Sequence, residues 1–135
     1  MKTHEQEMWD MIYEKLDSYL DIGQQSLRLW FGAMEIGCLT ENAVYFSTDN
    51  LNKKMVVEKN YMGGLSQAVK DVFGYEPKIY VISVETENFR DQLAELLAGD
   101  PEELKKALEN VCISDLHGEI KTENGIQKQL YPDYE

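Results

Sequence analysis

The sequence has 135 residues, a length that suits one domain with a small appendage. Hydrophobic residues make up 43% of the chain, which indicates a globular protein and excludes an intrinsically disordered one. The formal net charge of −12 repels the phosphate backbone of nucleic acids and suits a basic protein partner.

The charge is unevenly distributed along the chain. Residues 1–84 carry 8 basic and 12 acidic side chains, a net charge of −4, whereas residues 85–135 carry 5 and 13, a net charge of −8. No apolar run approaches the roughly 20 residues of a membrane-spanning helix, and the polar first residues lack a secretion signal. The two cysteines, Cys38 and Cys112, are far apart in the sequence, which indicates reduced thiols of a cytosolic protein and not a disulfide framework. We therefore expect a cytoplasmic protein without a membrane partner.

Two helices are predicted at the start of the chain. Over residues 5–19, apolar side chains recur every four positions, with Trp9 and Tyr13 on one side of the stripe. After Gly23, a second helix over residues 24–33 places four large apolar side chains on one face: Leu27, Trp30, Phe31 and Met34. These two faces are expected to pack against the rest of the domain.

Three strands and a long helix are predicted next. Residues 36–39 and 43–48 form two short strands joined by a polar turn. A long helix then begins after Asn50, with Leu51 and Met55 in its apolar stripe. The third strand, over residues 78–84, is apolar on both faces, which indicates that both faces are covered.

The pair Gly63-Gly64 interrupts the middle of the long helix. Each glycine costs about 1 kcal/mol relative to alanine within a helix. We therefore expect either a bend or a close contact with another helix at this point.

The remainder of the chain has a different pattern. A helix over residues 88–98 is followed by Asp100-Pro101 and then Glu103, which together predict the start of another helix that ends near residue 111. Residues 88–111 thus form a helical hairpin, which either adds core by packing on an open sheet face or has a separate regulatory role. Asn124-Gly125 predicts a β-hairpin over residues 118–130.

The sequence contains none of the motifs that we associate with catalysis. Phosphate-binding glycine loops and nucleophile elbows are missing, and His4 and His117 have no partners at metal-ligand spacing. We expect a protein that is not an enzyme and needs no metal or cofactor. Lys53, Lys54 and Lys59 form a basic cluster that either contacts nucleic-acid phosphates or is a solvated face.

Several of these features together resemble the N-terminal domain (domain I) of the bacterial chromosomal replication initiator DnaA, over about residues 7–84. Met8-Trp9 resembles the family's Leu-Trp, and the run Ser-Leu-Arg-Leu-Trp-Phe at 26–31 resembles its S-F-x-x-W-[FI] helix. Asn50 matches the family's helix start, and Tyr61 and Gly74 match residues of its long helix.

The resemblance implies an α+β fold: a KH-like α-α-β-β-α-β domain with a three-stranded sheet over residues 1–84. The acidic extension over residues 85–135 that follows has no counterpart that we identify in the family. The resemblance also implies a protein-binding role, with three residues on a self-association surface: Met8, Trp9 and Ile12. Ser26 occupies the family's position for helicase contact, which is often acidic there, and Asn52 aligns with the family's Phe at the start of the long helix; both are further candidates for partner binding. The expected partners are a second copy of the chain or a DnaA-type initiator, with the replicative helicase and initiation regulators as further candidates.

Three functions remain open at this point. The chain is an interaction module in replication initiation, a weak single-stranded nucleic-acid binder that uses the KH-like fold, or a stand-alone regulator that mimics the initiator's N-terminal domain. The negative charge opposes nucleic-acid binding. Whether the chain stands alone or belongs to a longer initiator also stays open.

Overall fold

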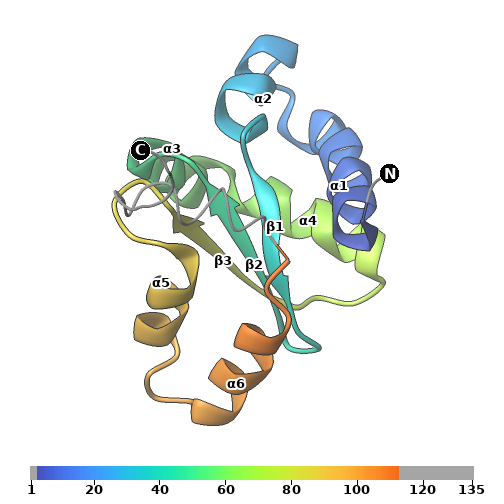
Figure 1. The fold of residues 1–135 in the computed structure, drawn as a ribbon. Coiled ribbons are helices and arrows are strands. Elements are labelled where there is room, and N and C mark those ends of the chain that lie inside the picture. The colour runs from blue at the N-terminus through green and yellow to red at the C-terminus, as the bar shows by residue number, and fades with distance from the viewer. Residues whose placement is uncertain (1–2, 113–135) are drawn as a thin grey trace.

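The computed structural model describes residues 3–112 and shows an α+β fold, as predicted (Figure 1). The elements follow one another as α1 (His4–Leu20), α2 (Gln24–Phe31), β1 (Glu35–Leu39), β2 (Ala43–Thr48), α3 (Leu51–Val56), the π-helical turn η1 (Val57–Tyr61), α4 (Met62–Phe73), β3 (Lys78–Ser83), α5 (Phe89–Leu96) and α6 (Pro101–Glu109). None of the helices within residues 3–112 is long and apolar enough to cross a membrane.

The three strands form one mixed sheet in the order β1-β2-β3. The β1 and β2 strands are antiparallel, whereas β2 and β3 are parallel. All six residues of the central strand β2 are buried. The pairing of β1 shifts by one residue between Ile36 and Cys38, and Gly37 lies there because a Cβ atom would come within 2.5 Å of the Phe89 ring.

Helices cover both faces of this sheet, so the third strand is covered on both faces as its sequence predicts. One core is formed by α1, α2 and α4 against the first face and includes the buried side chains of Leu16, Phe31 and Phe46. A second core is formed by α5 and α6 against the other face and includes Tyr45 and Phe89. The predicted helical hairpin therefore adds core to the sheet (Figure 1).

The long helix differs from its prediction. The π-helical turn η1 precedes the glycine pair, and it inserts a residue into the helical repeat. The apolar stripe is thereby shifted, so Leu51 and Met55 are 52% and 58% exposed instead of packed inward. Gly64 makes the expected close helix contact, since a Cβ atom there would lie 2.2 Å from Leu20 Cδ2 of α1.

The α6 helix is fixed to the sheet by a buried carboxylate. Glu103 accepts hydrogen bonds from Thr40 Oγ1 (2.7 Å), Asn42 Nδ2 (3.0 Å) and Tyr45 Oη (2.7 Å). Its backbone N–H is capped by Asp100 Oδ1 at 3.2 Å, as the sequence predicts. In a capping box, the Glu103 side chain would also accept a hydrogen bond from the Asp100 N–H. Here it binds groups of the sheet instead, so only the bond from the Glu103 N–H to Asp100 is formed.

The chain beyond α6 returns to the edge of β1. The helix ends at Glu109, two residues earlier than predicted, because Val111 pairs with Cys38 as an antiparallel bridge. The Cys112 N–H then donates to the Gly37 carbonyl at 2.9 Å. The predicted β-hairpin at residues 118–130 lies outside the described residues.

Candidate functional site

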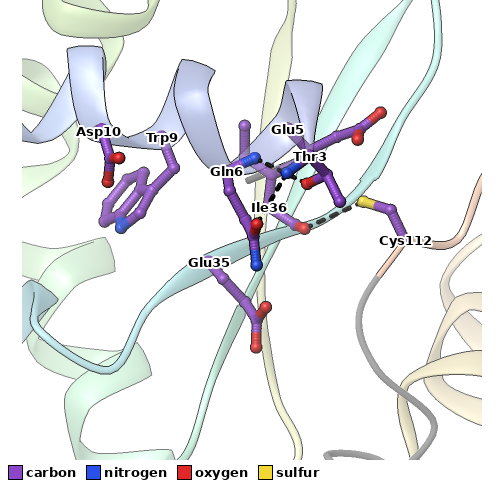
Figure 2. A pocket seen from close by; sticks show the side chains of 8 residues that line it. All are labelled: Thr3, Glu5, Gln6, Trp9, Asp10, Glu35, Ile36 and Cys112. Carbon is purple, nitrogen blue, oxygen red and sulfur yellow. Dashed lines mark hydrogen bonds between the residues drawn. The ribbon is translucent and has the colours of Figure 1, made fainter. Parts of the chain in front are cut away.

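A recess of about 250 Å³ lies where the start of α1 meets the start of β1. We call it the Trp9 recess, and it is lined by Thr3, Glu5, Gln6, Trp9, Asp10, Glu35, Ile36 and Cys112 (Figure 2). It combines an aromatic ring with three carboxylates. The lining residues come from the first turns of α1, from β1 and from the segment after α6, so the recess exists only in the folded chain.

The first turn of α1 is held in place by a capping box. The Thr3 N–H donates to Gln6 Oε1 at 2.8 Å, and the Gln6 N–H donates to Thr3 Oγ1 at 3.1 Å. Such reciprocal bonds satisfy two backbone donors at a helix start and fix its direction. Glu5 and Trp9 are four residues apart and therefore lie on one face of this helix.

Trp9 is held by other aromatic rings and is 9% exposed. Its ring meets Phe46 edge-on at a centroid distance of 5.4 Å, and Tyr13 at 6.1 Å. The sequence places Trp9 on the side of the helix stripe, and the structure places it within the first core with only a small part at the recess. Because β2 contributes Phe46, the helix pattern alone does not reveal this burial.

Cys112 lines the recess near two of its carboxylates, Glu5 and Glu35. Burial raises the pKa of the Cys112 thiol to about 12, and the charges of Glu5 and Glu35 contribute to the same shift. The thiol is fixed by donation to the Ile36 carbonyl at 3.2 Å (Figure 2). A protonated, hydrogen-bonded thiol is a poor nucleophile, so Cys112 lines the recess without offering chemistry there.

The other predicted partner-binding residues lie in different environments. Ile12 is completely buried in the first core, and Met8 is half-buried against it. Ser26 is half-buried on α2, and Asn52 is exposed on α3. Of the five predicted residues, only Trp9 lines the recess.

The predicted basic cluster is largely neutralised by neighbouring carboxylates. The Lys53 ammonium lies 3.2 Å from Asp49 Oδ1, and the Lys54 ammonium lies 3.0 Å from Glu58 Oε2. Lys59 is exposed. Two of the three predicted phosphate contacts are thus engaged in ion pairs, which weakens the case for a nucleic-acid site.

Within residues 3–112, no three His, Cys, Asp or Glu side chains gather closely enough to hold a metal ion. Burial raises the pKa of Cys38 to about 12, and its thiol donates to the Ala107 carbonyl at 3.0 Å.

Sequence reasoning missed the carboxylates around Trp9. The helical spacing of the sequence could have indicated Glu5 and Asp10, because they lie on the same face of α1 as Trp9. Glu35 could not be found in this way, since only the meeting of β1 with α1 brings it to the recess.

Comparison of the sequence with protein-family models and with curated proteins gives no match.

Proposed function

We propose that this chain is a protein–protein interaction module related to the N-terminal domain of DnaA, and that it acts in replication initiation or its regulation. Its partners are a second copy of itself or a DnaA-type initiator. The single observation that carries the proposal is the Trp9 recess, where the small exposed part of a mostly buried tryptophan lies among carboxylates. The resemblance of the sequence to the DnaA domain implies a contact surface at α1, which supports the same proposal.

The chemistry of the recess suits a basic side chain of the partner. Tryptophan is the best aromatic partner for a cation, and such contacts contribute about 0.5–2 kcal/mol. Glu5, Asp10 and Glu35 add carboxylates to the same recess. An arginine can stack on a ring and bind carboxylates at once, so it fits this combination better than lysine.

The contact is testable without disturbing the core. The double variant Glu5→Gln/Asp10→Asn removes two charges from the recess. The matched control Glu14→Gln/Asp17→Asn removes two charges from exposed positions of the same helix that do not line it. Both variants have the same net charge, so a general charge effect cancels between them.

Sedimentation equilibrium of the full chain, alone and mixed with a purified DnaA-type initiator, supplies the readout. We expect the recess variant to weaken self-association or initiator binding roughly 10-fold, a loss of about 1.4 kcal/mol. The control should bind like the wild type. If the wild-type chain neither self-associates nor binds the initiator at several hundred micromolar, the proposed function is refuted. If the two variants bind equally well, the recess is not the contact surface.

A further inference from the structure

The outer edge of β3 carries backbone groups that no strand pairs within residues 3–112. The sheet order places β3 at one edge, opposite β1 (Figure 1). Lys78 N–H donates to the Asn42 carbonyl at 3.0 Å, and Val84 N–H donates to the Thr48 carbonyl at 2.9 Å. In a parallel ladder, alternate residues bond to the same neighbour. The N–H and C=O groups of Ile79 and Val81 therefore point away from β2.

This edge lies in a groove between two helical walls. The groove has a volume of about 340 Å³ and is lined by Lys54, Glu58, Ile79, Tyr80, Val81, Ile82, Gln92, Glu95 and Leu96. One wall comes from α3 and η1, and the other comes from α5. Leu96 is 44% exposed in the second wall, and the 52% exposed Leu51 lies on the same face of α3 as Lys54, three residues away.

One end of the groove is closed by a side chain. Gln92 Nε2 donates to the Ser83 carbonyl and, at 3.0 Å, to the Glu87 carbonyl. The stretch of the edge that lines the groove is therefore the four residues from 79 to 82, half-buried at Ile79 and Tyr80 and only 3% and 4% exposed at Val81 and Ile82. Four extended residues span roughly 13 Å.

We propose that this groove binds an extended peptide of a partner protein, which adds a strand to the open edge of β3. Exposed edges accept peptides by this mode, in which backbone hydrogen bonds provide affinity and flanking pockets provide specificity. The peptide would bond to Ile79 and Val81. Its side chains would alternate between the α3 wall and the α5 wall.

The charges around the groove define the peptide further. The Lys54 ammonium lies 3.0 Å from Glu58, whereas Glu95, the third charged lining residue, has no ion-pair partner within residues 3–112. Glu85, Glu87 and Asp91 are exposed beyond the end of β3. A peptide with one or more Lys or Arg residues beside apolar ones matches this surface.

A second copy of the chain fits the groove less well than a peptide. Paired strands lie about 4.8 Å apart. Each edge lies between helical walls, α3 and η1 on one side and α5 on the other, so pairing of two copies would bring these walls together as well as their β3 strands. The groove lies at the β3 edge of the sheet, whereas the Trp9 recess lies at the β1 edge. This inference therefore does not depend on the proposed function.

Amide hydrogen exchange of the full chain tests the edge itself. In the free protein, the Ile79 and Val81 amides should exchange roughly 100-fold faster than those of Tyr80 and Ile82, which bond to β2. Slow exchange at Ile79 and Val81 at every protein concentration would mean that the chain already covers its own edge. Slowing that grows with concentration would mean that a second copy does so. Either result overturns the proposal.

Selection from a phage-displayed library of random octapeptides tests the occupant. With the full chain as bait, enriched peptides should contain Lys or Arg with apolar residues at alternate positions. A synthetic copy should slow exchange at Ile79 and Val81. The variant Glu95→Lys should weaken its binding about 5- to 10-fold, whereas the equally charged control Glu109→Lys on α6 should not. Failure to enrich any peptide, or protection confined to other amides, overturns the proposal.

Discussion

Replacing Glu103 with alanine should lower the free energy of unfolding by about 3–5 kcal/mol. The side chain is only 7% exposed, and it accepts three hydrogen bonds, at 2.7, 3.0 and 2.7 Å. Removing it leaves the hydroxyls of Thr40 and Tyr45 buried without their acceptor. Each unsatisfied buried donor costs about 1–3 kcal/mol. The predicted loss is therefore a large fraction of the ~5–15 kcal/mol that stabilises a typical domain.

Urea unfolding of the full chain at pH 7, followed by tryptophan fluorescence, measures this loss. The control is Glu102→Ala, an exposed neighbour in the same turn of α6, which should change stability by less than about 0.5 kcal/mol. If Glu103→Ala also stays within about 0.5 kcal/mol of the wild type, the buried carboxylate does not hold α6 on the sheet.

The same carboxylate should make stability depend on pH. Burial alone would raise the pKa of Glu103, but hydrogen bonds from Asn42, Tyr45 and Thr40 outweigh it and hold the pKa below its usual 4.5. A depressed folded-state pKa stabilises the fold above the unfolded-state value, and that stability is lost as pH falls through the folded-state value. The advantage of the wild type over Glu103→Gln should therefore shrink below about pH 4.5. An advantage that stays constant down to pH 3 would contradict the assigned pKa shift.

Three further predictions follow from single side chains. Gly64→Ala should destabilise the fold by about 1–3 kcal/mol, because its Cβ would lie 2.2 Å from Leu20 Cδ2. Gly63→Ala has open space around the new Cβ and should raise the free energy of unfolding by up to about 1 kcal/mol in the same urea assay. Trp9→Ala should cost about 3–5 kcal/mol of stability as well as binding, since the ring is buried; an unchanged urea midpoint would argue against its place in the core. Cys112 should react slowly with a thiol reagent at pH 8 in the folded chain and quickly in urea, because its pKa is raised to about 12; equal rates would contradict that environment.

Local patterns were sufficient to predict most helices and strands. The four-residue repeat of α1, the short apolar runs of β2 and β3 and the start signal at Asp100-Pro101 all lie within short windows of sequence. The α1 helix occupies His4–Leu20, against a prediction of residues 5–19. These elements form where the pattern predicts because their apolar faces match the two sides of one sheet.

Features that depend on tertiary contacts could not be predicted in this way. The π-helical turn in η1 turns Leu51 and Met55 outward, although their spacing suits a buried stripe. The position of Glu103 matches a helix cap, yet its side chain binds three groups that precede it by 58–63 residues. For Glu103, distant partners decide between two locally equivalent arrangements of the side chain.

The candidate site shows the same division. The sequence indicated Trp9, because a tryptophan beside a helix stripe is a candidate partner anchor. It did not indicate Glu35 or Cys112, which reach the recess from β1 and from the end of the described chain. Among the carboxylates of the recess, Glu35 is therefore a property of the fold, whereas Glu5 and Asp10 lie on the same helix as Trp9.

The most direct test of the Trp9 recess uses the two indole N–H signals that the chain's 2 tryptophans give in a ¹H–¹⁵N spectrum. Labelled chain is titrated with unlabelled chain and, separately, with the isolated N-terminal domain of a DnaA-type initiator. If the recess is the contact surface, the Trp9 signal moves in proportion to binding and the Trp30 signal on α2 moves much less. A Trp9 signal that stays fixed while the complex forms would contradict the account.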